Sequence, residues 1–333
     1  MSCLPDPSPV FETYWRFAAE RQSMYELRLR GAPAPWTLDA ILDSFRFTNV
    51  FRASDRVSQY LIRDVIYAGD ASADEVVFRV LLFKFFNRIE TWELLEAEFG
   101  PISLGSFDPA RADALLSRAR DNGRCVYSNA YIIPPLPGWG APKHAGHLRL
   151  AFDLVEGGLA ERVRSSNGLE ELFLLLRGVP GLGDFLAFQF AVDLCYSAVV
   201  DHDEDEFVVA GPGALDGLSK VFPRMDLRRA PDVIRALTEQ QEHWFEHFGL
   251  KFGGLFGRRL HLIDVQNLFC EISKYSRVAH PEFPGVAGRT RIKQTFKALG
   301  PLLRPFFPPK WGLHPTAGSP EPELAEIGQL ALV

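Results

Sequence analysis

The chain has 333 residues, of which 47% are apolar and 23% are charged, and this composition is typical of globular proteins. Its length allows one large core or two closely packed ones. No run approaches the roughly 18 apolar residues of a membrane span, and residues 1–9 lack a signal peptide, so we expect a cytoplasmic protein without membrane contact. Four scattered cysteines without a C-x-x-C pair argue against a disulfide framework or a zinc ribbon.

The net charge of −6 is unevenly distributed along the chain. Residues 251–311 contain 11 Lys and Arg against three acidic residues, a local charge of +8 that leaves −14 elsewhere. A basic section beside an acidic remainder is typical of one phosphate-binding face, and the alternative is a solvated surface that binds nothing.

Helical periodicity dominates the chain, and alternation typical of strands is almost absent. The fold class is therefore all-α, with two closely packed helical lobes: residues 1–126 and residues 148–306, joined by a loop at 127–147 that is rich in Pro, Gly and aromatic residues and followed by a Pro-rich tail at 307–333. In chain order, the pattern predicts helices over 11–29, 37–45, 54–67, 73–86, 91–99, 149–157, 169–176 and 187–198, and further helices to about 303.

A Pro-Gly-x-Gly hairpin joins two of these helices. The first helix has apolar residues at helical spacing, with Asn167 and Glu170 placed as a capping box. Glycines permit a tight turn, and the free amides where the second helix begins suit a phosphate. We therefore expect the hairpin to bind DNA, the alternative being an ordinary helix–helix turn. It consists of Val179, Pro180, Gly181, Leu182 and Gly183.

The segment from Gly168 to about Gly213 resembles helix-hairpin-helix DNA glycosylases, in which an aspartate follows the last hairpin glycine by roughly 20 residues. Asp203 has that spacing, with Asp201, Glu204 and Asp205 close by. A carboxylate there would stabilise the oxocarbenium character of the sugar and position water. Bifunctional members carry a lysine two residues after the glycine, where this chain has Phe185, so the resemblance implies a monofunctional reaction. The alternative is a solvated acidic loop.

A second set of motifs spans about residues 11–275. Its segments are Phe11-x-x-Tyr14-Trp15-x-Phe17 with Glu20-Arg21, Pro35-Trp36-Thr37, Phe47 to Arg52, Asp55 to Leu61, Phe86-Asn87-x-x-x-Thr91-Trp92, Asn129-Ala130-Tyr131, Phe207 to Gly213 and Cys270-Glu271-x-x-Lys274-Tyr275. These segments resemble the helical domain of phage 5-hydroxymethyluracil DNA kinases and the related glutamyl/putrescinyl-thymine pyrophosphorylases, and the resemblance implies action on 5-substituted pyrimidines in DNA. No phosphate-binding G-x-x-x-x-G-K-[ST] motif occurs here, which argues against a kinase.

Polar residues within these segments are candidates for a base pocket. An Asp-Arg-Gln set can read a base edge or clamp a phosphate, and it can equally form an ion-pair network between helices. Glu271 and Lys274 likewise form either a helix salt bridge or a wall of the pocket. The candidates are Asn49, Arg52, Asp55, Arg56, Gln59, Tyr60, Asn129, Tyr131, Glu271, Lys274 and Tyr275.

The loop at 127–147 carries Tyr131 and Trp139, which could wedge into a duplex or cover an extruded base, or simply pack on the core. His243 and His247 share a helix face, but no third ligand follows at a diagnostic spacing. We therefore expect neither a metal nor a cofactor.

These observations lead to the hypothesis of a DNA glycosylase that flips and excises a 5-hydroxymethyl-derived, possibly glucosylated, pyrimidine, with defence against phages as its role. The first alternative is a transferase that attaches an amine or amino acid to an activated 5-hydroxymethylpyrimidine in DNA. The second is a DNA-binding module without enzymatic activity. All three share one partner, DNA that contains modified pyrimidines.

Overall fold

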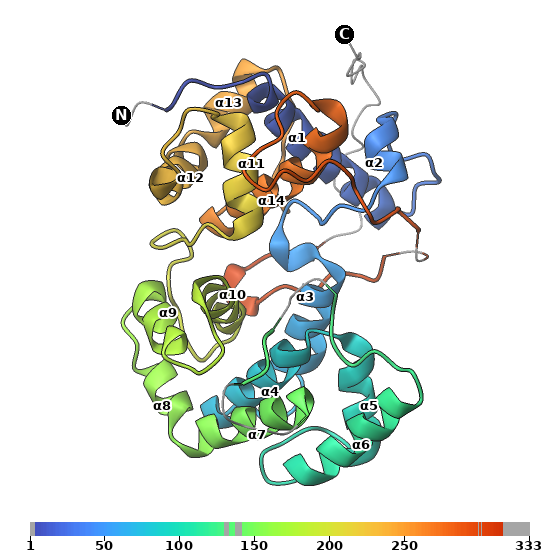
Figure 1. Cartoon of the computed structure of the whole chain (residues 1–333), viewed down its shortest axis with the longest axis vertical. Coiled ribbons are helices and arrows are strands. Elements are labelled where there is room, and N and C mark those ends of the chain that lie inside the picture. Colours follow the sequence, from blue (N-terminus) through green and yellow to red (C-terminus); the bar gives the residue numbers. More distant parts are fainter. Residues whose placement is uncertain (1–3, 130–132, 137–141, 299, 301, 316–333) are drawn as a thin grey trace. The chain divides into compact units, whose positions relative to one another are not determined.

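A computed structural model of the chain describes residues 4–129, 133–136, 142–298, 300 and 302–315 (Figure 1). Within this part the regular secondary structure is helical, and extended pairing is confined to two isolated bridges, Phe45 with Thr295 and Leu255 with Arg258. The predicted all-α class is confirmed. Among the same residues, no helix is long and apolar enough to cross a membrane.

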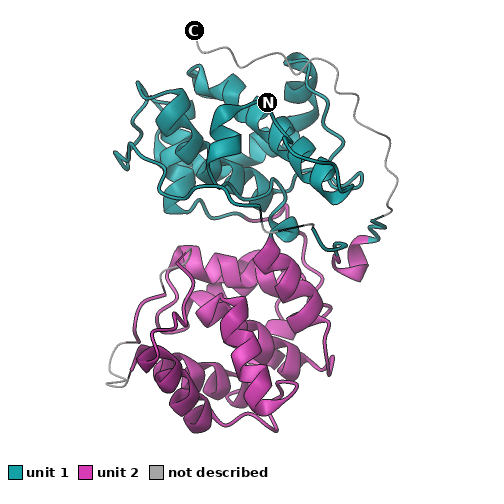
Figure 2. Cartoon of the chain, turned by 90° about the vertical axis from the view of Figure 1, so that its right-hand side faces the viewer, with its two compact units in different colours: residues 1–55, 208–305, 312–333 teal, residues 56–207, 306–311 magenta. Residues whose placement is uncertain are grey.

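The chain forms two compact units (Figure 2). Unit 1 comprises residues 1–55, 208–305 and 312–333, and unit 2 comprises residues 56–207 and 306–311. These boundaries differ from the lobes expected from the sequence, because the first 55 residues pack with segments that follow residue 207. Periodicity reports which residues are helical, but it does not report which helices pair.

In unit 1, α14 packs against α1, α11 and α12. Tyr14 of α1 stacks on Phe269 of α14, with ring centroids 4.6 Å apart. Gly217 lets α11 approach closely, because a Cβ there would lie 2.0 Å from the Phe269 carbonyl oxygen. The helices of this unit are α1 (Val10–Leu29), α2 (Ala40–Ser44), α11 (Pro212–Val221), α12 (Ala230–Glu239), α13 (Gln241–His247) and α14 (Leu262–Ala279), with the 3₁₀ turns η1 (Arg52–Ser54) and η3 (Leu227–Arg229).

In unit 2, α4 is the central helix and packs against α7, α8 and α10. Its residues from Val76 to Phe86 are all buried, as expected of a helix that is apolar on every side. A buried ion pair, Lys84 Nζ to Asp193 Oδ2 at 2.6 Å, joins α4 to α10. The helices are α3 (Arg56–Tyr60), α4 (Ala73–Phe86), α5 (Ile89–Phe99), α6 (Pro109–Asp121), α7 (Lys143–Glu156), α8 (Leu159–Arg164), α9 (Leu169–Arg177) and α10 (Asp184–Cys195), with the π-helix η2 (Leu61–Ile66) and the 3₁₀ turn η4 (Pro309–Trp311).

The helix predicted over 54–67 is present in part: the helical residues begin at Arg56 and run through α3 directly into the π-helix η2, after the 3₁₀ turn η1. Asp55 has an extended backbone, with ψ 148°, and its carboxylate accepts the Asn49 N–H group. Further along, Arg79 Nε of α4 donates to the Val65 carbonyl within the π-helix at 2.8 Å. Contacts from outside the segment therefore accompany its late start and its change of helix type.

Several predicted boundaries also shift. Asp39 caps α2, which begins at Ala40, and α7 begins at Lys143 within the expected loop. The Asn167–Glu170 capping box is wrong: Gly168 is the N-cap, and Glu171 accepts the Asn167 N–H at 2.9 Å. The further helices predicted after residue 198 are present as α11 to α14, but they end at Ala279 rather than near residue 303, since the described residues of 280–308, rich in Pro and Gly, contain no helix.

Candidate functional site

A polar cluster in unit 1 surrounds residues 47–55, the segment that follows α2 and contains η1. The Thr48 N–H group donates to Glu271 Oε2 at 3.0 Å, and the Asn49 N–H group donates to Asp55 Oδ1 at 2.8 Å. Asn49 Nδ2 donates to the Ser54 carbonyl at 2.8 Å. Carboxylates from α14 and from the end of the segment itself thus hold its backbone in place.

Arg21 on α1 also binds this segment. Its side chain is buried, and Nη2 donates to Asn49 Oδ1 at 2.8 Å and to the Phe47 carbonyl at 3.3 Å. Sequence reasoning did not include Arg21 among the pocket residues. The available signal was its place on the apolar face of the helix, four residues after Phe17, because a charge there needs a buried partner.

Glu271 and Lys274 form the α14 side of the cluster. Lys274 Nζ lies 2.6 Å from Glu271 Oε2 and 5.3 Å from the ring centroid of Phe47. Glu271 is 6% exposed, whereas the Lys274 side chain is 25% exposed. Glu271 thus forms the helix salt bridge and also binds the segment through Thr48, while the role of the pair in a base pocket stays a prediction.

Tyr275 and Glu20 extend the cluster toward α2. Tyr275 Oη donates to Asp39 Oδ2 at 2.5 Å, and Thr37 Oγ1 donates to Glu20 Oε1 at 2.5 Å. Burial raises the pKa of Glu20, the Thr37 hydrogen bond lowers it, and the charge of Asp39 raises it further. Glu20 Oε2 is buried without a hydrogen-bond partner among the described residues. Burial and the charge of Asp39 therefore favour the neutral form of this carboxyl group, and the Thr37 hydrogen bond favours the ionised form.

Two groups of the cluster titrate far from their ordinary ranges. Burial raises the pKa of Asp55 to about 7, and the charge of Glu271 adds to the rise, while the Asn49 N–H and the arginines at 21 and 52 oppose it. Burial lowers the pKa of Arg21 to about 10 against the opposing charges of Asp55 and Glu271. Near neutral pH, Asp55 can thus either donate or accept a hydrogen bond.

The other predicted pocket residues either lie outside this cluster or contact neighbouring helices and loops. Arg52 is buried in η1, where its N–H group donates to Asp264 Oδ1 at 2.8 Å. Arg56, Gln59 and Tyr60 belong to unit 2: Arg56 pairs with Glu90 at 3.5 Å, Gln59 exchanges two hydrogen bonds with the Phe306 backbone, and Tyr60 stacks on Phe83. Asn129 is exposed, while Tyr131 and Trp139 lie outside the described residues.

The hairpin lies in unit 2 between α9 and α10. Val179 and Leu182 are buried, whereas Pro180 and Gly183 are exposed. Gly181 has a φ of +84°, and a Cβ there would meet Leu136 Cδ2 at 2.9 Å. Gly183 begins α10 without a side-chain cap, and nothing lies within 4 Å of a Cβ at this position. The exposed start of α10 agrees with the geometry expected of a phosphate site, and its binding of DNA stays a prediction.

The acidic segment after α10 forms a turn in unit 2. Asp203 is exposed, and its Oδ1 accepts the Asp205 N–H at 2.8 Å. Asp201 is 94% exposed and lies 3.7 Å from Lys310 Nζ, whereas Glu204 is buried. Asp203 thus caps its own turn, and Asp201 faces solvent.

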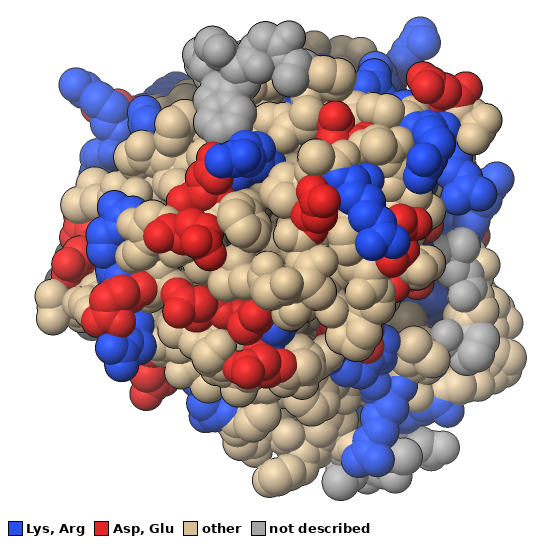
Figure 3. Space-filling view, turned by 90° about the horizontal axis from the view of Figure 1, so that it is seen from below, with Lys and Arg blue, Asp and Glu red and all other residues tan. Residues whose placement is uncertain are grey.

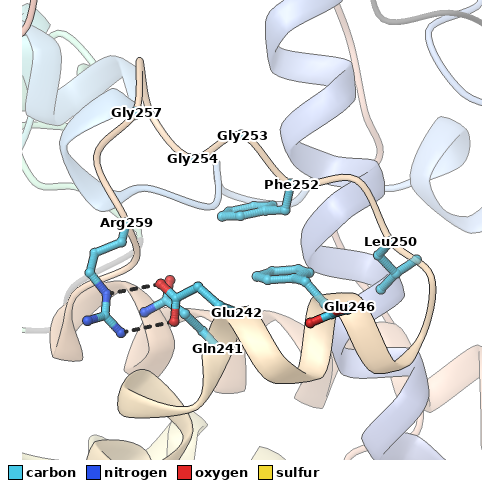
Figure 4. A pocket seen from close by; sticks show the side chains of 10 residues that line it. Gln241, Glu242, Glu246, Leu250, Phe252, Gly253, Gly254, Gly257 and Arg259 are labelled. Carbon is cyan, nitrogen blue, oxygen red and sulfur yellow. Dashed lines mark hydrogen bonds and ion pairs between the residues drawn. The ribbon is translucent and has the colours of Figure 1, made fainter.

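Unit 1 also contains a cavity of about 410 Å³ between α13 and the Gly-rich loop that follows it (Figure 4). Phe245 and Phe252 stack at 4.1 Å beside it, and Arg259 pairs with Glu242 at 3.4 Å across its rim. Sequence reasoning missed this cavity. Its available signal was the run Gly249 to Gly257, where Gly254 and Gly257 have positive φ.

The structure also shows how the charged residues and the two histidines of α13 are arranged. On the face drawn in Figure 3, acidic and basic side chains are interspersed. Several cations of the basic section are paired, including Arg259 with Glu242 and Lys274 with Glu271. His243 and His247 lie 5.9 Å apart by ring centroids, and the described residues contain no group of three side chains suited to a metal ion.

The family to which this helical chain belongs is identified by its sequence. The sequence model described as "5-hmdU DNA kinase, helical domain" matches residues 8–285, so the chain belongs to this family. It is 27% identical over 288 residues to a protein of Bacillus phage SP10 named 5-hmdU DNA kinase. The match covers 80% of this chain and 45% of that protein, so the chain spans about half the length of this relative. No solved structure matches the chain.

This membership overturns the prediction of a DNA N-glycosylase and hydrolase, and with it the defence role that depended on base excision. The relative is named for a kinase, which transfers a group rather than hydrolysing an N-glycosidic bond. The transferase alternative is closer to the findings, although the relative's name specifies a kinase rather than an amine transferase.

Proposed function

We propose that this chain binds DNA containing 5-hydroxymethyluracil and holds the modified base for group transfer at its 5-hydroxymethyl oxygen. The observation that carries the proposal is the convergence of Arg21, Asn49, Asp55, Glu271 and Lys274 on one segment of unit 1. Its support is membership of a family named for a 5-hmdU DNA kinase.

The cluster has the groups that such a base requires. A pyrimidine edge presents both donors and acceptors, which Asn49 and the Asp55 carboxyl can match. The hydroxymethyl oxygen must lose a proton when it attacks an electrophile, and a carboxylate with a pKa near ambient pH is a suitable base. Asp55 has such a pKa, about 7. The proposal concerns the acceptor base and assigns no nucleotide site to this chain.

Binding to matched duplexes tests the proposal. Duplexes with a single 5-hydroxymethyluracil, thymine or 5-hydroxymethylcytosine are titrated with the protein and followed by fluorescence anisotropy. We expect the 5-hydroxymethyluracil duplex to bind about five- to tenfold more tightly than the thymine duplex, because one satisfied polar contact is worth about 1–1.5 kcal/mol. Equal affinity for the two duplexes would falsify the proposal.

Two variants locate this preference. Asp55→Ala should abolish it, whereas Asp232→Asn should preserve it, since Asp232 is an exposed residue of α12 in the same unit. Circular dichroism and thermal unfolding check that both variants fold. A preference that survives Asp55→Ala would place recognition of the base outside this cluster.

A further inference from the structure

An exposed basic segment of unit 1 is left unexplained by the polar cluster. Between Glu282 and Glu321 the sequence has no acidic residue, and four cations occur within nine positions. Their side chains are exposed and make no ion pair within the described part of the chain. We call residues 289–297 the basic ribbon, and its cations are Arg289, Arg291, Lys293 and Lys297.

The backbone of the basic ribbon is fixed at several points. It pairs antiparallel with the end of α2, because the Arg46 N–H donates to the Gln294 carbonyl at 3.0 Å and the Phe296 N–H donates to the Ser44 carbonyl at 2.9 Å. Arg277 Nη1 donates to the Arg291 carbonyl at 3.0 Å. The exposed cations therefore stand on an ordered backbone, which lowers the entropic cost of binding a partner.

The basic ribbon also lies next to the segment that carries the polar cluster. Arg46 pairs with the ribbon, and within three residues Thr48 and Asn49 bind Glu271 and Asp55. Three extended residues span roughly 10 Å, which equals the axial rise of about three nucleotides of one DNA strand. A base held at the cluster would thus have its neighbouring phosphates over the ribbon.

We infer that the basic ribbon binds the phosphates of the DNA strand that flanks the modified base. This inference rests on the proposed function. In it the polar cluster recognises the modified base, and the basic ribbon provides affinity for the DNA backbone. Exposed Arg and Lys side chains without carboxylate partners suit phosphate oxygens, which they bind without reading sequence. The ribbon therefore contributes equally to the binding of modified and unmodified duplexes.

The test is the salt dependence of binding by Arg291→Gln/Lys293→Gln. Wild type and variant are titrated with the 5-hydroxymethyluracil and thymine duplexes at four salt concentrations. We expect the variant to bind both duplexes more weakly by the same factor. The slope of log affinity against log salt should fall by about 0.9 for each phosphate that is no longer neutralised, and by about 0.7 if the strand is single.

The matched control is Arg118→Gln on α6 of unit 2, an exposed arginine that makes no ion pair with other described residues. It should leave the slope unchanged, and thermal unfolding should show that all variants are folded. An unaltered slope in the ribbon variant overturns the inference, even if wild type still prefers the modified duplex. A reduced slope supports the ribbon, even if wild type shows no preference and the proposed function fails.

Discussion

At the scale of single residues, Asp55 has the most unusual environment among the charged residues of the polar cluster. Burial raises the pKa of its carboxyl to about 7, with Glu271 adding to the rise. The folded protein therefore binds a proton at Asp55 more tightly than the unfolded chain, whose aspartates titrate near 3.9. Its contribution to the free energy of unfolding is fully present below pH 4 and is lost as the pH rises through 7.

Asp55→Asn should remove this pH dependence, because asparagine does not titrate but can still accept the Asn49 N–H. Relative to wild type, the variant should gain up to about 1 kcal/mol of stability per pH unit between pH 5 and 7. Urea unfolding at pH 5, 6, 7 and 8 measures the difference. Parallel curves for the two proteins would show that Asp55 is ionised throughout this range, and Asp232→Asn provides the exposed control.

Sequence reasoning identified some cluster residues and missed others for a physical reason. Asn49, Asp55, Glu271, Lys274 and Tyr275 were chosen from motifs, and the structure brings these residues together around one segment. Periodicity does not report that the Arg21 and Glu20 side chains meet Asn49 and Thr37, which lie 28 and 17 positions further along the chain, so Arg21 and Glu20 were not included. The same limit placed Gln59 in the pocket, although its amide binds the Phe306 backbone.

At the scale of elements, the packing of α11 on α14 depends on a single glycine. Gly217→Ala would bring a Cβ within 2.0 Å of the Phe269 carbonyl oxygen. In a free helix this substitution stabilises by about 1 kcal/mol, but here we expect a loss of about 1–3 kcal/mol from overpacking. Chemical denaturation measures the change, and Gly105→Ala, which meets nothing within 4 Å, is the control. Increased stability of Gly217→Ala would mean that the helices can move apart at little cost.

The hairpin offers a similarly selective experiment. Gly181→Glu is a poor probe of DNA binding, because the positive φ and the nearby Leu136 make any side chain there disruptive. Gly183→Glu is better, since a Cβ at this position meets nothing within 4 Å. If the start of α10 binds phosphate, Gly183→Glu should weaken DNA binding several-fold without lowering the melting temperature. Unchanged affinity would mean that the hairpin is only structural, and Gly183→Ala separates charge from bulk.

Local signals predicted some elements well and others poorly. The predicted helix over 73–86 matches α4, whose apolar residues and terminal Asn87 in the left-handed region agree with the pattern. The segment at 54–67 is helical only from Arg56 and becomes π-helical after Tyr60, and Asn49 and Arg79 bind groups near these two places. Local propensity therefore succeeds where tertiary contacts agree with it.

At the scale of the whole molecule, the two units should respond to acid in opposite ways. In unit 1, burial raises the pKa of Glu20, Asp55 and Asp264. In unit 2, burial lowers the pKa of His147 to about 4, and its ring is held between the Tyr127 hydroxyl and the Pro134 carbonyl. Stability due to His147 is thus present above pH 6.5 and is lost as the pH falls toward 4, whereas the unit 1 carboxyls stabilise the fold at low pH.

Hydrogen exchange followed by mass spectrometry tests this contrast directly. Between pH 7 and pH 5, protection factors corrected for intrinsic exchange should fall for the helices of unit 2 and rise or hold for those of unit 1. His147→Gln should flatten the change in unit 2. A uniform decline in both units would contradict the assignment of these buried groups.

The discontinuous composition of unit 1 has a consequence for synthesis on the ribosome. Residues 56–207 form most of unit 2 and emerge before α11 and α14 exist. Since domains generally fold as units while the chain is made, unit 2 can fold first, while α1 and α2 wait for partners from beyond residue 207. During that interval the apolar face of α1 is not yet buried against α11 and α14. The Thr48 N–H group can meet Glu271 only after α14 has been made, so the polar cluster forms after residues 56–207 have emerged.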